Sequence, residues 1–493
     1  MEKHAPRIQP NNFLIQGESI APLSKEDHYR YLGVPIGLIP NISDLAKLID
    51  ELTSKLDKIE NSLLAPWQKL DTIRTFIQPC LTYALRSTDP TTKSLQSYRS
   101  QLIKTIPSVC YLPTRATTHY IFASKQAGGL GLADPTRENH LQTIVQAVKM
   151  LASSDPTIAT MAKSELRQTV RFAAQSHPTP SLISNFLSNA PDRRLDSIRS
   201  CTGSLWSHTR NATKTVSITM NVPDVGPPSI SSPDYADEVA AKDVCRFLHN
   251  LERENSAKAL CDLRDQGKVA RSLSNDKFGN GSNWHYTGLN LRFNDWRFIH
   301  RARLNCIPIN SVKHRWSNSS PSCRHCEHDE TLPHVLCHCT PNMPAITIRH
   351  NKIVDRITNA VCHGSISTNQ TVRDSGSPVH PDIVIQNNNH VTIIDVCCPF
   401  ENGEEALEEA VARKELKYLH LKSHFEVQNK SCEVFGFAIG AHGTWHPGNE
   451  RVLSALGMSP RYKNLFRKLC CTDVIQGSTD IYRQHLGCDD VLP

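Results

Sequence analysis

The sequence feature that most constrains the fold is a short segment with an acidic residue near each end, PDIVIQNNNHVTIID at residues 381–395. Two β-branched runs flank a cluster of asparagines, which is typical of a β-hairpin. A turn centred between Asn388 and Asn389 places Asp382 directly opposite Asp395 on the paired strand. Like charges at facing positions repel each other. The arrangement therefore predicts a divalent cation between the two carboxylates.

Further charged residues follow this hairpin. Glu401 lies just beyond the second strand, and a helix is predicted over 402–424. Lys414 and Lys417 share a face of that helix because they are three residues apart. Two carboxylates holding a magnesium ion, with a lysine nearby, are groups suited to phosphodiester hydrolysis. The alternative is an ordinary hairpin with two exposed acids beside a charged helix.

A second cluster of ligand-type residues lies at 323–339, CRHCEHDETLPHVLCHC. A CxxC turn presents two thiolates, and a histidine and a cysteine on a short helix complete a tetrahedral zinc site. The predicted zinc ligands are Cys323, Cys326, His334 and Cys339. The side chains that remain alternatives for one position are His325, His328, Cys337 and His338. Such a site organises a fold and does not itself catalyse.

Residues 291–316 form a basic segment interleaved with aromatic residues. The basic members are Arg292, Arg297, Arg301, Arg303, Lys313 and Arg315, and the aromatic members are Phe293, Trp296, Phe298 and Trp316. Basic side chains bind phosphates while aromatic faces stack on unpaired bases. The alternative is an amphipathic helix whose aromatic residues are core and whose arginines are solvated. The adjacent zinc cluster favours nucleic-acid binding.

The composition indicates a soluble globular protein with roughly three domains. The 493 residues carry a net charge of +7, which is compatible with a nucleic-acid partner. No apolar run approaches the roughly 20 residues that cross a bilayer, so no membrane partner is expected. Seventeen scattered cysteines indicate a reducing compartment.

Periodicity gives a coarse order of elements. Strands are predicted within 11–37, 381–396 and 432–440, and helices over 43–60, from 66 with a break at Pro79, 91–106, 235–265, 402–424 and 450–471. The Ser/Thr/Pro/Asn-rich stretch from 175 to 235 is predicted to be linker and surface loops. The motif DYADE at 234–238 resembles a polymerase aspartate pair, but helix capping by Asp234 or Ser232 is the preferred interpretation.

Several of these motifs, in this order, resemble the C-terminal half of non-LTR retrotransposon proteins that carry a restriction-like endonuclease. The matching segments are CRHC…H…C, RHN (349–351), PDIVI…IIDVCCPFE, KELKY (414–418) and FGFAIGAHGTWHP (435–447). Nearer the start, YRYLGVPIG resembles the exit from a reverse transcriptase palm, and LLAPWQKLDTIRTFIQPCLTYAL resembles the thumb that follows.

The resemblance implies roles for individual residues. It makes Asp382 and Asp395 ligands of Mg²⁺ (or Mn²⁺), Glu401 a candidate further ligand, and either Lys414 or Lys417 the catalytic lysine. It makes Arg349, His350 and Asn351 either DNA-facing or structural. It also supports a Zn²⁺ ion in the Cys-Cys-His-Cys knuckle.

We therefore expect an α+β multidomain protein. Its parts are a residual palm edge and helical thumb (1–140), a linker region with helices and flexible loops (141–290), the basic segment and zinc knuckle (291–345), and a mixed α/β restriction-endonuclease-like domain (346–493).

The resemblance implies a magnesium-dependent DNA endonuclease that nicks chromosomal DNA for target-primed reverse transcription. Thumb and knuckle would bind nucleic acid, including the element RNA, in the nucleus with a cytoplasmic pool. The palm carboxylates that should precede the thumb are absent, so the chain should not polymerise. Two alternatives remain: an inactive, zinc-dependent nucleic-acid-binding remnant, or a product that never folds stably because a thumb without its palm exposes an apolar face.

Overall fold

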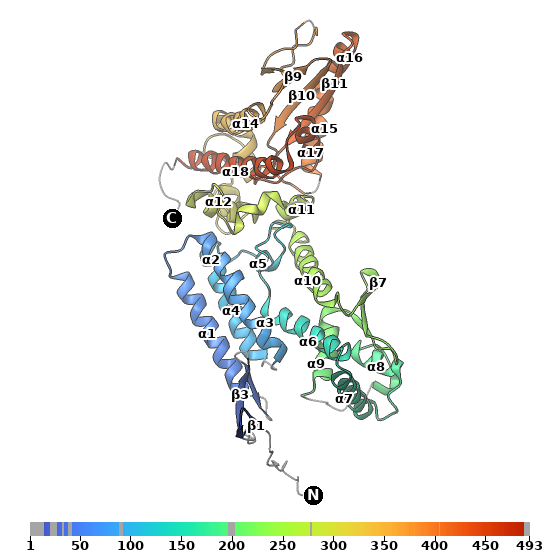
Figure 1. Ribbon diagram of the computed structural model, residues 1–493. Coiled ribbons are helices and arrows are strands. Elements are labelled where there is room, and N and C mark those ends of the chain that lie inside the picture. Colours follow the sequence, from blue (N-terminus) through green and yellow to red (C-terminus); the bar gives the residue numbers. More distant parts are fainter. Residues whose placement is uncertain are drawn as a thin grey trace. The chain divides into compact units, whose positions relative to one another are not determined.

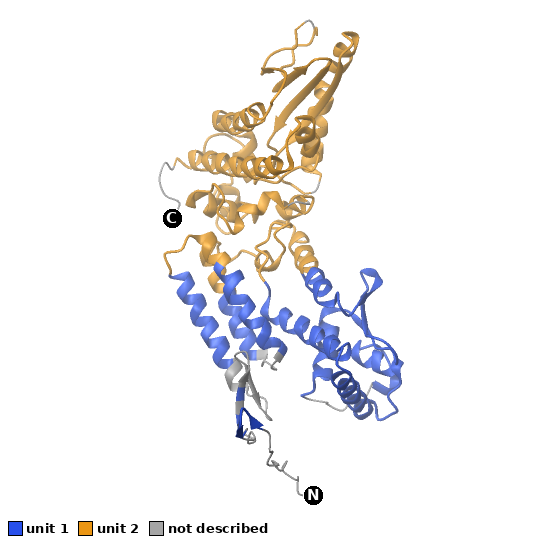
Figure 2. Cartoon of the chain, viewed as in Figure 1, with its two compact units in different colours: residues 1–61, 72–102, 133–252 blue, residues 62–71, 103–132, 253–493 orange. Residues whose placement is uncertain are grey.

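The computed structural model describes residues 14–19, 27–31, 34–37, 42–87, 92–195, 203–276, 279–373, 375–403 and 405–487. The chain divides into two compact units, shown in Figure 2. Unit 1 comprises residues 1–61, 72–102 and 133–252, and unit 2 comprises residues 62–71, 103–132 and 253–493. Parts of the predicted strands within 11–37 and of the predicted loops within 175–235, together with residue 91 of one predicted helix, lie outside the described residues.

The first part of unit 1 contains two short hairpins and a group of helices. Its elements are β1 Leu14–Ile15, β2 Glu18–Ser19, β3 His28–Tyr31, β4 Val34–Gly37, α1 Ile42–Glu60, η1 Ile73–Ile77, α3 Gln78–Ser87 and the start of α4 Thr92–Val109. The predicted helices over 43–60 and 91–106 are confirmed. The predicted break at Pro79 is wrong, because residues 66–87 are helical throughout. The π-helical turn η1 ends two residues before Pro79 and shifts the backbone hydrogen bonds there, since the N–H of Gln78 donates to the carbonyl oxygen of Ile73.

The second part of unit 1 is a packed module and differs from the predicted linker. It contains α6 Pro135–Leu151, α7 Pro156–Ala174, α8 Pro180–Leu187, η2 Arg193–Leu195, α9 Leu205–Val216, β5 Thr219–Asn221, β6 Ser229–Ser232, β7 Tyr235–Ala240 and the start of α10 Val244–Cys261. Their apolar faces share one core, in which Trp206 is fully buried.

Residues of the types that suggested a linker over 175–235 delimit helices throughout this module. Asp134, Asp155, Thr179 and Ser204 accept hydrogen bonds from backbone N–H groups at the starts of α6, α7, α8 and α9. Prolines occupy the first position of α6, α7 and α8. Both features are typical of helix N-termini, so a composition rich in Ser, Thr and Pro misleads when helices are short.

The DYADE motif also differs from its prediction. Tyr235–Ala240 is strand β7, which pairs with β6 in an antiparallel ladder. Ser232 belongs to β6. The motif therefore forms the turn and second strand of a hairpin, and the predicted helix cap at Asp234 or Ser232 is wrong.

Unit 2 is built around a four-stranded mixed sheet in the order β11-β10-β9-β8. The strands are β8 Ser365–Thr368, β9 Ile383–Asn387, β10 His390–Cys397 and β11 Ser431–Ala438. β8, β9 and β10 are antiparallel neighbours, whereas β10 and β11 are parallel. One face packs on α14 Met343–Thr358, α17 Asn449–Ala455 and α18 Pro460–His485, and the other on α15 Ala406–Tyr418 and α16 His420–Val427 (Figure 1).

The remaining elements of unit 2 are short or lie between the longer ones. They are α2 Pro66–Thr72, α5 His119–Phe122, α11 Lys268–Ser274, η3 Asn280–His285, α12 Phe293–Arg303, α13 Asn310–Lys313, η4 His334–His338 and η5 Thr340–Asn342. Across the described parts of the chain, no helix combines the length and apolar character needed to span a bilayer. Helices and small sheets together make a mixed α/β protein.

The burial of Trp206 tests whether the region from 133 to 252 is a folded module. Trp206→Ala would remove a fully buried indole and should cost about 3–5 kcal/mol of unfolding free energy. Limited proteolysis should then cut α8 and α9 rapidly, whereas Trp316→Ala, which removes an exposed indole, should leave the digestion pattern unchanged. Equal proteolysis of wild-type protein and Trp206→Ala would contradict a packed core here.

Candidate metal centres

The hairpin brings Asp382 and Asp395 together as the register predicts. Residue 383 pairs with 394 and residue 387 with 390, so the turn lies at Asn388–Asn389. Asn388 has φ +50°, a left-handed conformation that asparagine tolerates. The backbone N–H of Asp382 donates to Asp395 Oδ1 at 3.3 Å, and the N–H of Val396 donates to Asp382 Oδ2 at 2.7 Å. Two largely buried carboxylates therefore lie side by side at one end of β9 and β10.

Of the two candidate lysines, Lys414 reaches the aspartates. Its Nζ donates to Asp395 Oδ2 at 2.5 Å from α15. The Nζ of Lys417 lies 4.7 Å from the ring centre of Tyr418. Three residues fall short of a full helical turn of 3.6, so the two lysines diverge around the helix. The geometry favours Lys414 as the lysine of this site.

His350 joins the same cluster from α14. Its Nε2 lies 3.1 Å from Asp382 Oδ2 and 3.2 Å from the carbonyl oxygen of Val396. The resemblance implied only a DNA-facing or structural role for His350, because nothing in its spacing from Asp382 signals a contact. It is the packing of α14 against the sheet that brings the imidazole to the aspartate.

The neighbouring Arg349 has a structural role. Its guanidinium is buried and donates to Ser478 Oγ at 2.8 Å and to the carbonyl oxygen of Leu336 at 3.0 Å. A side chain held in this way cannot contact a phosphate, so the DNA-facing alternative is wrong for Arg349.

The electrostatics of the carboxylate pair involve both Lys414 and His350. Burial and the nearby negative charge of Asp382 raise the pKa of Asp395 above its usual value. Burial also opposes ionisation of Asp382, but hydrogen bonds from His350 and Val396 lower the pKa of that carboxyl overall. Although burial disfavours its charge, the bond to Asp395 raises the pKa of Lys414. Lys414 therefore faces Asp395 while His350 faces Asp382, and, despite burial of the imidazole, Asp382 in turn raises the pKa of His350.

Glu401 does not join this pair. Its buried carboxylate accepts the N–H of His442 at 2.8 Å, contacts His442 Nδ1 at 2.6 Å and accepts the N–H of Thr444 at 3.3 Å. A Cβ on Gly440 would lie 2.0 Å from Glu401 Oε1, so this turn closes around the carboxylate. Glu401 organises residues 440–444, and its predicted role as a ligand beside the two aspartates does not fit these contacts.

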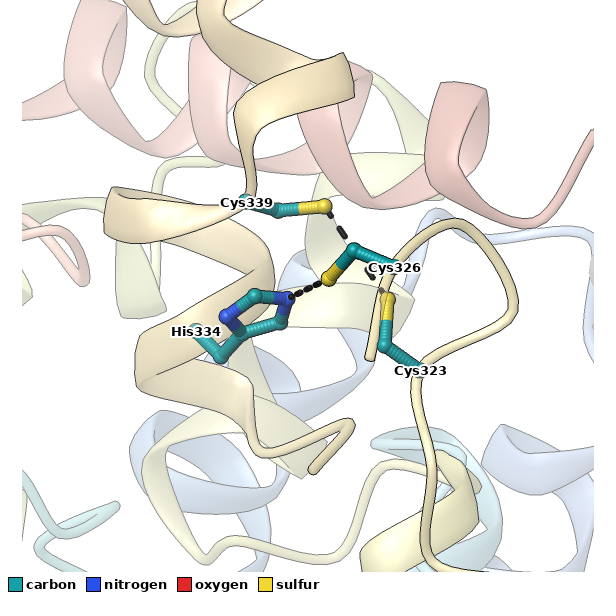
Figure 3. Close-up of side chains that lie close together, drawn as sticks. All are labelled: Cys323, Cys326, His334 and Cys339. Atoms are coloured by element: carbon teal, nitrogen blue, oxygen red, sulfur yellow. Dashed lines mark hydrogen bonds between the residues drawn. The ribbon is translucent and has the colours of Figure 1, made fainter. Parts of the chain in front are cut away.

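The four predicted zinc ligands converge on one point, as Figure 3 shows. Their ligand atoms all lie within 4.8 Å of one another. Cys326 Sγ lies 3.2 Å from His334 Nε2, and Cys323 Sγ lies 4.0 Å from Cys339 Sγ. Tetrahedral zinc at ~2.0–2.3 Å from each ligand requires spacings of about 3–4 Å. The donor set fits Zn²⁺ after small adjustments.

The alternative ligands have other contacts or lie apart. Cys337 Sγ lies 3.6 Å from the carbonyl oxygen of Cys398, and burial raises the pKa of its thiol to about 11. His325 Nε2 lies 2.6 Å from the carbonyl oxygen of His485, and His338 is exposed. His328 stacks on His334 with 5.4 Å between ring centres and places Nδ1 3.8 Å from Cys326 Sγ, but its nitrogen is not among the four ligand atoms that lie within 4.8 Å of one another.

A buried pair that the sequence did not signal supports the zinc cluster. His485, near the end of α18, places Nε2 3.2 Å from Glu330 Oε2 and 3.9 Å from Cys323 Sγ. Arg324 donates to both oxygens of Glu330, at 2.8 and 2.9 Å. Such outer contacts orient metal ligands, and here they tie the last helix to the knuckle.

The basic segment has two kinds of residue. Trp296 and Phe298 are buried, as the core alternative has it. Arg303 fits neither interpretation, because it is buried and donates to the carbonyl oxygens of Gly281 and His442. Arg303 cannot bind nucleic acid, and that prediction is wrong.

Other basic side chains of this segment are partly or fully exposed. The guanidinium of Arg297 lies over the ring of Tyr111, and Arg301 donates to that residue's carbonyl oxygen. Arg315 pairs with Asp265. Lys313, Arg315 and Trp316 are exposed, and the guanidinium of Arg115 lies 4.6 Å from the centre of the Trp316 ring. Nucleic-acid binding by this end of the segment stays a prediction.

Comparison with known proteins gives distant relatives. No protein-family model matches the chain. It is 21% identical over 485 residues, 97% of this chain and 85% of the relative, to a retrovirus-related Pol polyprotein from the type-1 retrotransposable element R2 of Popillia japonica. Another protein of that name and organism is 30% identical over 131 residues, 26% of this chain and 21% of the relative. An uncharacterized protein of Caenorhabditis elegans is 24% identical over 313 residues, 60% of this chain and 89% of the relative. These similarities support a protein related to retrotransposon Pol polyproteins.

Two cysteines that are two residues apart, Cys337 and Cys339, make a matched test of the zinc site. Cys339→Ser should lose bound zinc and lower the thermal midpoint, because it removes one converging thiolate. Cys337→Ser should keep one zinc per chain, because that thiol points to Cys398. Metal content by mass spectrometry and a thermal scan would measure both effects. Equal zinc content in the two variants would contradict the assignment.

Proposed function

We propose that this chain is a metal-dependent DNA endonuclease of retrotransposon origin. The observation that carries the proposal is the cluster of Asp382, Asp395 and Lys414 at one end of a mixed sheet. Similarity to Pol polyproteins supports a nucleic-acid substrate. The proposed reaction is hydrolysis of one phosphodiester bond of a chromosomal target, which primes reverse transcription of the element RNA.

Asp382 and Asp395 would hold Mg²⁺ or Mn²⁺. Oxygen ligands suit these hard cations, and the paired carboxylates supply two of them. When bound, such an ion polarises the phosphate and lowers the pKa of a water molecule. Hydrogen bonds from the N–H groups of Asp382 and Val396 fix one oxygen of each carboxylate, so the ligands are oriented before the metal arrives.

Lys414 would act through its charge. Its ammonium group pairs with Asp395 and is only partly buried, so it can also approach a phosphate at the mouth of the site. A cation at that position stabilises negative charge that develops on the phosphate oxygens. His350 positions the Asp382 carboxylate from the opposite helix, which makes it a positioning residue.

The zinc knuckle and the exposed end of the basic segment would bind nucleic acid beside the cutting site. Lys313, Arg315 and Trp316 provide charge and an exposed aromatic face. The helices before residue 110 would serve as the thumb. Because the proposed substrate is chromosomal DNA, we expect the protein in the nucleus, with a cytoplasmic pool where the element RNA is bound.

One observation favours a second candidate function. Asp395 is almost fully buried, and Lys414 already offsets its charge without a metal ion. A chain with this ion pair closed would bind nucleic acid through its zinc knuckle without cutting it. Binding and cleavage must therefore be measured on the same variants.

A nicking assay on supercoiled DNA separates the two functions. Asp382→Asn and Asp395→Asn should abolish magnesium-dependent nicking, and Lys414→Ala should slow it by about 10²–10³-fold, as for loss of one charge-stabilising donor. Lys417→Ala is the matched control on the same helix and should stay within about twofold of wild type, since its ammonium group does not contact the aspartates.

DNA binding by the same proteins provides the second measurement. Undiminished binding together with lost nicking in Asp395→Asn supports the endonuclease. If wild-type protein binds DNA but does not cut it with magnesium or manganese, the result supports the non-catalytic alternative and contradicts the endonuclease proposal.

A further inference from the structure

Helix α7 in unit 1 bears a groove with a strongly basic lining. The groove has a volume of ≈ 390 Å³. Its lining residues are Thr160, Lys163, Ser164, Arg167, Gln168, Arg171, His177 and Pro178. Three of these lining residues carry a permanent positive charge. The structure describes all of the lining residues, and none of them is acidic. The others supply hydroxyl, amide and imidazole groups that hydrogen-bond to phosphate oxygens.

The three cations follow one side of the helix. Lys163, Arg167 and Arg171 are spaced by four residues, so they lie in a row about 6 Å apart and ~12 Å long. This length is about the axial rise of three to four nucleotides of one strand at ~3.4 Å each. The row therefore suits a linear series of phosphates better than one compact anion.

The fold does not depend on these cations. The side of α7 that packs into the core is formed by Ala162, Leu166, Val170 and Ala173. Within the part of the chain that the structure describes, Arg167 alone of the three has an ion pair, with Asp224 at 3.4 Å, and both side chains are more than half exposed. Exposed pairs of this kind contribute about 0–1 kcal/mol, so a phosphate can replace the carboxylate at little cost.

We infer that this groove binds the phosphate backbone of a nucleic-acid strand. The inference rests on the proposed function, to which it adds a second contact for the nucleic-acid partner, in the module from 133 to 252. The described residues that line the groove include no Phe, Tyr or Trp, so the contact recognises mainly backbone charge and carries little base preference. RNA and DNA share this chemistry, and the test distinguishes them.

The test uses the full chain with neutral substitutions that keep an unbranched polar side chain and similar helix propensity. The triple variant K163Q/R167Q/R171Q removes the row, and K149Q/K214Q/K242Q removes the same charge from exposed lysines elsewhere in unit 1. Each protein is titrated, without added magnesium, into labelled single-stranded RNA and into labelled duplex DNA over a range of salt concentrations. Circular dichroism and thermal midpoints establish that both variants are folded.

The row should account for about three released counterions. The groove variant should bind at least about tenfold more weakly at low salt, and its slope of log K against log salt should fall by ~2 for RNA or ~3 for duplex DNA. The nucleic acid that shows the fall is the ligand. Affinity and slope equal to those of the control variant for both nucleic acids would overturn the inference. Because no cutting is measured, an inactive nuclease site would leave this result intact.

Discussion

Repulsion between two carboxylates on paired strands is the constraint on which the candidate site depends. The hairpin register fixes Asp382 opposite Asp395, and neither can move away without slipping every side chain to the other face of the sheet. Both faces of the sheet are covered by helices, so water can screen these charges only at one end. The fold brings Lys414 from α15 and His350 from α14 to that end. Two like charges held close together within an otherwise consistent fold are expected at a functional site.

Helix α18 connects the two candidate metal centres within unit 2. Its middle packs against the sheet through Phe466 and Cys470, and its last turn places His485 beneath the zinc cluster. Arg349 links α14 to the same helix and to Leu336 in the middle of η4, the turn that begins with the zinc ligand His334. Zinc in the knuckle would therefore also hold α14, the helix that carries His350. A structural metal can support a catalytic one through such packing alone.

The sequence predicts local geometry well and side-chain environment poorly. The aspartate pair and the zinc ligands follow from spacing along a turn or a strand, so a few residues determine them. The choice between Lys414 and Lys417 required the packing of α15 on the sheet, and the burial of Arg303 required residues over a hundred positions away. The 175–235 segment was misjudged because capping residues and N1 prolines have the composition of a linker. The contact between His350 and Asp382 has no signal in the sequence.

The central claim is that one divalent cation binds between Asp382 and Asp395. Anomalous diffraction at the manganese edge, from crystals soaked in Mn²⁺, measures the position of that ion directly. A single strong peak within bonding distance of both carboxylates, about 2–2.5 Å from the nearest oxygens, is the result that this account predicts. Ordered carboxylates with no manganese peak between them, or a peak held by other residues, would contradict it.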